Sequence, residues 1–210
     1  MSEILRRSAQ NKNLQMLYDA AYKKKDAELF EKLLKTPGCK LLIPAISREI
    51  MRLNFYVAAD NLEMVRDVRK KISKLRLNNE NAKAFYGAAF GFFAEKGERE
   101  LCEQLLQEMR KQFDGTTDPA AVMMLFDCQL VYDVYIDRNL DRIDGLKQLI
   151  SAAPDNESKS VYQYRLAKLY HYAGQRSNCI EQLKAARANT SSKKAKDKIG
   201  RIINGRWEEL

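Results

Sequence analysis

The chain has 210 residues, of which 45% are hydrophobic and 31% are charged, and this composition excludes an intrinsically disordered protein. Its 9 glycines and 4 prolines are too few to punctuate a many-stranded sandwich or barrel. The 37 Lys and Arg residues outnumber the 28 Asp and Glu residues, and this excess of positive charge favours acidic partners.

Apolar residues recur at helical spacing along nearly the whole chain, and no window shows the sustained alternation of a half-buried strand. The pattern predicts an all-α protein. Five short amphipathic helices are the clearest, and each has one apolar face to bury. Their stripes are Leu29, Phe30, Leu33 and Leu34; Met64, Val65, Val68 and Ile72; Leu101, Leu105, Leu106 and Met109; Ile143, Leu146, Leu149 and Ile150; and Ile180, Leu183 and Ala186.

A short polar break precedes each stripe, and a second apolar helix precedes each break. Asp, Asn and Gly suit such breaks because they adopt turn geometry or cap the helix that follows. The breaks are Lys25-Asp26, Asp60-Asn61, Lys96-Gly97-Glu98, Arg138-Asn139 and Gly174-Gln175. The preceding apolar helices include residues 14–22, 50–56, 86–93, 130–135 and 162–170.

Successive breaks are about 34, 37, 42 and 35 residues apart, and a helix–turn–helix unit repeated at that period is typical of an α-solenoid. We therefore expect a right-handed α-solenoid of about five helix–turn–helix repeats. Pro44 and Pro119 fit the first turns of helices, where a missing N–H is tolerated.

The end of the chain differs from the repeats. The hydrophilic run 189–198 is the only stretch that resembles a linker. After it, Ile199, Ile202, Ile203 and Trp207 form one more amphipathic stripe, which predicts a helix that caps the solenoid. The expected organisation is a helical repeat domain over residues 1–188, followed over residues 189–210 by a polar linker and a C-terminal capping helix of the same domain.

The last helix pair resembles the tetratricopeptide repeat (TPR), in which small residues let two helices approach closely and large residues fill the space between them. The matching residues are Leu166, Ala167, Tyr170, Gly174, Cys179, Leu183 and Ala186. The third pair is similar through Phe93, Gly97, Cys102, Leu106 and Met109. The resemblance in period covers residues 14–188, although Ser191 stands where the family usually has Pro. A generic array of helical hairpins is the alternative.

The TPR resemblance implies protein or peptide binding, without catalysis and without a cofactor. In both kinds of array the first helices of successive pairs line a concave groove that receives a helix or an extended peptide. The peptide-binding residues predicted on these helices are Arg48, Arg52, Asn54, Lys83, Tyr86, Gln163, Tyr164 and Lys168. Tyr172 is a further candidate, because tyrosine gives a large contact area at a small cost in side-chain entropy.

The sequence offers little catalytic chemistry. It has no Gly-rich loop ending in Gly-Lys-Ser/Thr, no nucleophile elbow and no His-Glu-x-x-His motif. The one histidine, His171, is expected near a helix end as a solvated or capping residue. Cys39, Cys102, Cys128 and Cys179 form no Cys-x-x-Cys pair and are expected as reduced, buried thiols. We therefore expect no enzyme, no cofactor and no metal site.

An alternative function is the binding of nucleic acid or an anionic membrane by the last helix. Its basic patch consists of Lys193, Lys194, Lys196, Lys198, Arg201 and Arg206. Phosphate contacts from such a patch would give an affinity that falls steeply with salt. Asp197, Glu208 and Glu209 dilute the patch, so this function ranks below protein binding.

Charge is distributed unevenly along the chain. Residues 1–113 have a net charge of +7, residues 114–157 of −6 and residues 158–210 of +8. The acidic segment lacks the spacing of a calcium loop, so its aspartates predict a solvated face; they include Asp127, Asp133, Asp137, Asp141 and Asp144. The charges can pair within one chain or in a homodimer. The homodimer contacts would join Asp133, Asp137 or Asp141 to Lys194, Lys198 or Arg201.

No window of about 18 uncharged apolar residues occurs, so no transmembrane segment is expected in this chain. The first seven residues lack the apolar core of a signal peptide, and reduced thiols fit a cytoplasmic protein. Met1 can begin either a natural chain or a fragment, and a membrane anchor upstream of it would lie outside this sequence.

Overall fold

The computed structural model describes residues 3–210, and this part of the chain contains helices and no β-strand, which confirms the prediction of an all-α protein. Over these residues the α-helices are α1 (Glu3–Tyr18), α2 (Ala27–Leu34), α3 (Pro37–Leu42), α4 (Ala45–Ala58), α5 (Leu62–Ile72), α6 (Asn79–Glu95), α7 (Arg99–Gln112), α8 (Pro119–Tyr135), α9 (Arg142–Ala152), α10 (Asn156–Tyr172), α11 (Arg176–Asn189) and α12 (Lys193–Ile203). A π-helical turn, η1 (Asp19–Lys24), continues α1, and a 3₁₀ turn, η2 (Trp207–Glu209), follows α12. None of the described helices combines the length and the apolar character that a membrane span requires.

Each predicted break separates two helices, and each contains a residue in the left-handed backbone conformation. The first helices of the pairs are α1 with η1, α4, α6, α8 and α10, and the second helices are α2, α5, α7, α9 and α11. The left-handed residues are Lys25 (φ 53°), Asp60 (φ 57°), Gly97 (φ 72°), Arg138 (φ 53°) and Gly174 (φ 70°). The next residue donates its backbone N–H to a carbonyl near the end of the first helix, over 2.8–3.0 Å in all five cases. This bond closes the first helix, because it satisfies a carbonyl that lacks an intrahelical partner.

In two of the breaks a polar side chain also caps the second helix. Asp26 accepts a hydrogen bond from the backbone N–H of Leu29 at 2.9 Å, and Asn61 accepts one from Met64 at 3.1 Å. Both contacts satisfy N–H groups that the first turn of a helix leaves without a partner. At these two breaks, therefore, two residues are enough to end one helix and begin the next.

The short helix α3 is not among the helices that the sequence pattern predicts. Thr36 caps it by accepting a hydrogen bond from the backbone N–H of Cys39 at 3.3 Å, and Pro37 occupies its first turn. A helix of one or two turns carries too few residues to show an apolar period. The cap, the proline and the burial of Cys39 and Leu42 together account for this element.

Helix α12 begins inside the stretch predicted as a linker, and this corrects the boundary of that linker. Ser192 caps the helix by accepting a hydrogen bond from the backbone N–H of Ala195 at 3.3 Å, so residues 193–198 are helical. The apolar stripe starts only at Ile199 because the first two turns carry mostly lysine. Ile199 and Ile202 are buried against α11, so α12 packs on that helix.

The described chain divides into two compact units. The N-terminal unit contains the described residues up to Phe92 and Gln104–Met124, and the C-terminal unit contains Phe93–Glu103 and Leu125–Leu210. The division falls within α6, α7 and α8, so each of these helices contributes residues to both units.

The core of the N-terminal unit forms where helix pairs bury their predicted stripes. Phe30 of α2 stacks on Phe55 of α4 with ring centroids 4.6 Å apart. Helix α4 packs against α5, in which Val65, Val68 and Ile72 are fully buried. Complete burial of side chains of this size contributes about 1.5–3 kcal/mol each to folding.

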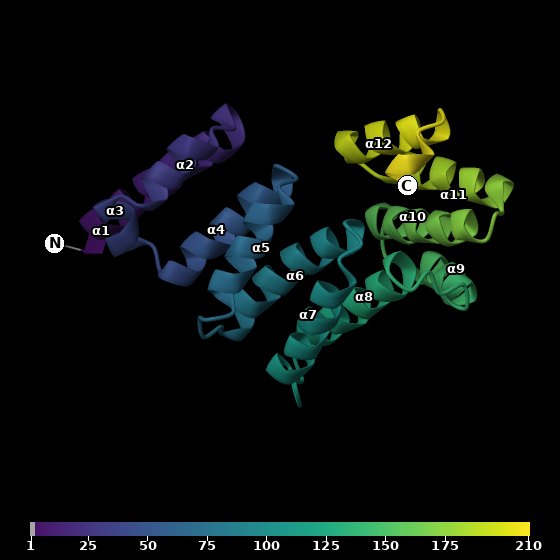
Figure 1. Cartoon of the computed structure of the whole chain (residues 1–210), viewed down its shortest axis with the longest axis horizontal. Coiled ribbons are helices and arrows are strands. Elements are labelled where there is room, and N and C mark those ends of the chain that lie inside the picture. Colours follow the sequence, from purple (N-terminus) through teal and green to yellow (C-terminus); the bar gives the residue numbers. More distant parts are fainter. Residues whose placement is uncertain (1–2) are drawn as a thin grey trace. The chain divides into compact units, whose positions relative to one another are not determined.

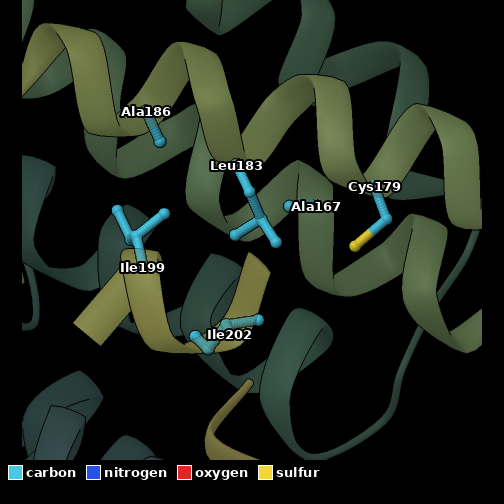
Figure 2. Close-up of a cluster of buried hydrophobic side chains, with 6 residues drawn as sticks. All are labelled: Ala167, Cys179, Leu183, Ala186, Ile199 and Ile202. Atoms are coloured by element: carbon cyan, nitrogen blue, oxygen red, sulfur yellow. The ribbon is translucent and has the colours of Figure 1, made fainter. Parts of the chain in front are cut away.

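In the C-terminal unit α10 lies between α9 and α11, and α12 lies beside α11 (Figure 1). Three small residues of α10 and α11, Ala167, Cys179 and Ala186, are fully buried. Figure 2 shows Leu183 of α11 facing this cluster together with Ile202 of α12. The small side chains let α10 and α11 approach closely, as the sequence pattern predicts.

Candidate functional site

The N-terminal unit contains a groove whose cavity measures about 490 Å³. Two first helices, α1 with its η1 extension and α4, supply most of its walls, and α2 contributes one residue. The lining residues are Asn11, Leu14, Gln15, Leu17, Tyr18, Ala21, Tyr22, Phe30, Met51 and Asn54. The volume falls in the range of about 300–1,000 Å³ that is usual for binding clefts.

The groove combines an apolar floor with aromatic and carboxamide side chains. Tyr18 and Tyr22 are 53% and 47% exposed although they are large, and their ring centroids lie 5.1 Å apart. Leu17 and Phe30 are buried beneath. Tyrosine pairs of this kind provide a broad contact surface that loses little side-chain entropy on binding.

Carboxamides stand at both walls of the groove. Asn11 is on α1 and Asn54 is on α4, and both are exposed. Each carboxamide both donates and accepts hydrogen bonds, so it can satisfy a peptide N–H or C=O. The Gln15 side chain instead donates to Asp19 at 2.9 Å.

Of the residues predicted on α4, the structure puts only Asn54 in the groove lining. Arg52 forms ion pairs with Glu31 at 2.7 Å and with Glu49 at 3.0 Å, and its side chain is 11% exposed. The hydroxyl of Tyr56 donates to the same Glu31 carboxylate at 2.8 Å. Arg52 therefore joins α4 to α2 within the fold. Arg48 is half-buried, and its Nε atom is buried without a hydrogen-bond partner.

The two residues predicted on α6, Lys83 and Tyr86, make contacts within the N-terminal unit and do not line the groove. Tyr86 is 5% exposed and makes an edge contact with Phe113 at 6.3 Å between ring centroids. Burial, with the nearby Glu108 carboxylate, raises the pKa of Tyr86 to about 12. Tyr86 was predicted in the groove, and its burial corrects that prediction. Lys83 forms ion pairs with Glu80 at 2.7 Å and Asp118 at 3.0 Å.

Of the residues predicted on α10, one is buried between helices and the others lie in a second region. Gln163 is buried and accepts a hydrogen bond from Asn189 of α11 at 2.8 Å, so it joins two helices and does not line a groove. Tyr164 and Lys168 lie in a second region, where aromatic rings and cations meet. Tyr172 belongs to the same region, because the guanidinium of Arg138 lies 4.8 Å from its ring centroid.

The predictions missed the groove residues of α1 and η1. Leu14, Leu17, Tyr18 and Tyr22 indicate an apolar helix, and that pattern is equally typical of a buried face. The available signal was the pair of tyrosines one turn apart beside Asn11, because a wholly buried face rarely carries so many polar atoms.

The basic patch is divided by contacts within the chain. Glu209 forms ion pairs with Arg201 at 2.8 Å and with Arg206 at 3.4 Å. The ammonium of Lys198 lies 5.5 Å from the ring centroid of Tyr164. Lys193 and Lys194 are exposed at the first turn of α12, and Lys196 is half-buried. Nucleic-acid or membrane binding by this patch stays a prediction.

The cysteines and the histidine, which were the remaining candidates for catalysis or metal binding, make packing contacts within the fold. The four cysteines are free and buried. Burial raises the pKa of Cys102 and Cys128 to about 12 and that of Cys179 to about 11, so these thiols stay protonated at neutral pH. His171 is exposed and stacks on Trp207 at 5.9 Å between ring centroids. Among residues 3–210 no group of three or more His, Cys, Asp or Glu side chains is arranged to hold a metal ion.

Comparison of the chain with protein-family models, with curated proteins and with solved structures found no match. Its function is therefore inferred from its own side chains.

Proposed function

We propose that this chain is a non-enzymatic protein-interaction module of TPR-like helix pairs, and that the groove of its N-terminal unit binds a partner segment. The observation that carries the proposal is the pair of half-exposed tyrosines over an apolar floor, formed by the first helices of two successive pairs. The five helix pairs with left-handed turn residues support a repeated hairpin unit.

The proposed partner is an acidic amphipathic segment. Its large apolar side chains would enter the groove, because burying them removes apolar area from water. Residues 3–25 carry six basic and two acidic side chains, and Lys23, Lys24 and Lys25 directly follow Tyr22 of the groove. Acidic side chains on the partner would complement this charge.

The test is the binding of a synthetic helix-forming peptide of about 15 residues, with Leu or Phe at every third or fourth position and Glu elsewhere. Fluorescence anisotropy would measure its affinity for the wild-type chain and for the variants Tyr18→Ala and Tyr22→Ala. We expect each variant to weaken binding at least about tenfold, because exposed aromatic anchors dominate such interfaces.

The matched control is Leu41→Ala, since Leu41 is 79% exposed in the same unit and does not line the groove. This variant should bind as the wild type does. Equal affinity of both tyrosine variants and the wild type would contradict the proposed site. A peptide with Lys in place of Glu that binds more tightly would contradict the acidic partner.

A further inference from the structure

The C-terminal unit has a groove of its own between α8 and α9, and its cavity measures about 340 Å³. Helix α8 supplies one wall, which includes Phe126 and Leu130. Helix α9 supplies the other wall, which includes Gly145, Leu149 and Ala152. All of these residues belong to the C-terminal unit, so the groove lies within one compact unit. We call it the α8–α9 groove.

The groove joins the buried core to an exposed aromatic ring. Leu130 and Leu146 line the groove and are buried, because they also belong to the core where α8, α9 and α10 meet. Phe126 lines the same groove and is 48% exposed. A large exposed ring beside an apolar cavity marks a surface that another molecule can bury.

Gly145 lies inside α9, where a glycine makes the helix less stable than an alanine would. The residue is exposed, and a Cβ added there would meet no atom within 4 Å. Packing within the chain therefore does not require a glycine at this position. A glycine in the wall of a groove lets the backbone of another molecule approach closely.

The small residues of this wall follow the helix period. Ala152 is exposed and lies seven residues, or two turns, after Gly145, so both present the α9 backbone on one face. Two helices can pack closely where the residues at their contact are small. A wall of this kind fits the side of a second helix.

An ion pair that is already satisfied lies at the end of the groove nearest the α8–α9 connection. Arg142 holds the buried carboxylate of Asp133 through its Nε atom at 2.7 Å and its Nη2 atom at 2.6 Å. Gln129 donates a hydrogen bond to the other carboxylate oxygen at 2.7 Å. These three side chains have no net charge together, so they do not favour a partner of either sign.

The rim of the groove on α9 is acidic. Asp141 and Asp144 are exposed and lie one turn before Gly145 and Gln148, which line the groove. Asp144 pairs with Lys147 at 2.9 Å, but the two side chains are 84% and 53% exposed, and such a pair is weak. Asp141 forms no ion pair within residues 3–210. Two aspartates and one lysine leave the rim with a net charge of −1.

We propose that the α8–α9 groove is the docking site of a basic amphipathic helix of a partner protein. The apolar face of this helix covers Phe126 and packs on the α9 backbone at Gly145. Its lysine or arginine side chains pair with the aspartates of the rim. The N-terminal groove is proposed to bind an acidic segment, so the two grooves select different partners.

The test measures the binding of a synthetic helix-forming peptide of about 18 residues, with Leu and Ala on one face and Lys on the other, by fluorescence anisotropy. We expect Phe126→Ala to weaken binding at least about tenfold. Gly145→Leu should abolish binding because leucine fills the groove, and it should raise the urea midpoint because leucine favours a helix. Opposite effects on binding and stability exclude unfolding as the cause of the loss.

The matched control is Gly87→Leu. Gly87 is an exposed glycine inside α6, its Cβ would also meet no atom within 4 Å, and it lines neither groove. This variant should bind the peptide as the wild type does. Asp141→Asn tests the charge of the rim, and it should weaken binding about two- to fivefold at about 0.1 M salt and much less at about 0.5 M salt.

No binding of the Lys peptide by the wild type, or binding that survives Gly145→Leu, would overturn the docking site. A peptide with Glu in place of Lys that binds as tightly, and that Gly145→Leu also releases, would overturn the basic partner. Tyr18→Ala changes only the N-terminal groove and should leave binding of the Lys peptide unchanged. The charge preference of the N-terminal groove is measured in Gly145→Leu, where only that groove is open, so the two proposals can fail separately.

Discussion

Glu157, in the first turn of α10, ties that helix to the end of α11. It accepts a hydrogen bond from the hydroxyl of Thr190 at 2.5 Å, and from the backbone N–H and hydroxyl of Ser191 at 2.8 and 3.0 Å. A proline at position 191 would lack the N–H that Glu157 uses.

These bonds make stability depend on pH. The Ser191 N–H, followed by the Thr190 and Ser191 hydroxyls, lowers the pKa of Glu157 from its ordinary value of 4.5. A lowered folded-state pKa stabilises the fold fully above the unfolded-state pKa, and the contribution is lost as the pH falls through the folded-state value. We expect Glu157→Gln to lower the urea midpoint at pH 7 and to have a shrinking effect below about pH 4.5.

The matched variant for this experiment is Glu181→Gln, which changes an exposed glutamate of α11 in the same unit. Its midpoint should stay near that of the wild type at both pH values. A deficit of Glu157→Gln that is the same at pH 7 and pH 3 would show that the carboxylate charge does not carry the effect.

At the residue scale, the sequence predicted the helices correctly but not always whether a residue on a helix faces the core or the groove. Tyr86 and Gln163 were assigned to a groove because both stand on first helices, yet both are buried. Neighbouring positions on a helix point about 100° apart, so a small error in the direction of the groove exchanges core and surface residues. Asn54 lines the groove of the N-terminal unit, and its role in peptide binding stays a prediction.

At the scale of elements, the left-handed residue in each break is the feature that repeats most regularly. Glycine fills this position at Gly97 and Gly174, but Lys25, Asp60 and Arg138 fill it in the other pairs. A side chain with Cβ pays about 1–2 kcal/mol for this conformation, while glycine adopts it freely. The three non-glycine turns therefore store strain that the surrounding helices offset.

Substitutions at these turns should change stability in opposite directions. Lys25→Gly should raise the free energy of unfolding by about 0.5–1 kcal/mol, and Gly174→Ala should lower it by about 1 kcal/mol. A Cβ at Gly174 would meet no atom within 4 Å, so the loss would come from the backbone alone. Urea denaturation measures both.

Gly87→Ala is the control for this prediction. Gly87 lies inside α6, and a Cβ there also meets no atom within 4 Å. Alanine should stabilise this helix by about 0.5–1 kcal/mol, because the backbone is already helical. If Gly174→Ala and Gly87→Ala had effects of the same sign, the left-handed strain would not be the cause.

All five breaks could be predicted from the sequence, because turn residues and caps are local signals. The short helix α3 and the start of α12 could not. Each depends on one cap, Thr36 or Ser192, and its first turns lack an apolar period.

At the scale of the whole molecule, four of the five aspartates named in the acidic segment form ion pairs within the chain. They pair with arginine or lysine at 2.5–2.9 Å; the pairs are Asp127 with Arg165, Asp133 with Arg142, Asp137 with Arg99 and Asp144 with Lys147. Asp133 is buried, so it does not offer the surface contact that the homodimer prediction assigned to it. Of the other groups in that prediction, Arg201 is paired with Glu209.

These contacts favour the intramolecular alternative, and sedimentation velocity tests it. At micromolar concentration we expect the sedimentation coefficient of a monomer at both about 0.1 M and about 0.5 M salt. A dimer at the lower salt that dissociates at the higher one would instead support pairing between chains. In that case Lys194→Glu, which changes an exposed basic residue of α12, should weaken the dimer.

The composition and period of the sequence could predict the class of the whole molecule, since an all-α chain with paired helices follows from them directly. Which charged side chains pair with one another, and which stay free to bind a partner, could not be predicted in the same way. Net charge by segment gives the sum of acids and bases, whereas the pairing of Asp137 with Arg99 depends on which helices meet in space.

The four buried thiols give the chain an internal set of kinetic reporters. Cys39, Cys102, Cys128 and Cys179 lie one each in α3, α7, α8 and α11. A thiol-specific reagent reaches such a group only while its helix is transiently open, so each rate of modification converts into a local opening free energy. The modification rates of the four cysteines in the native protein therefore report on the opening of four different helices, without any substitution.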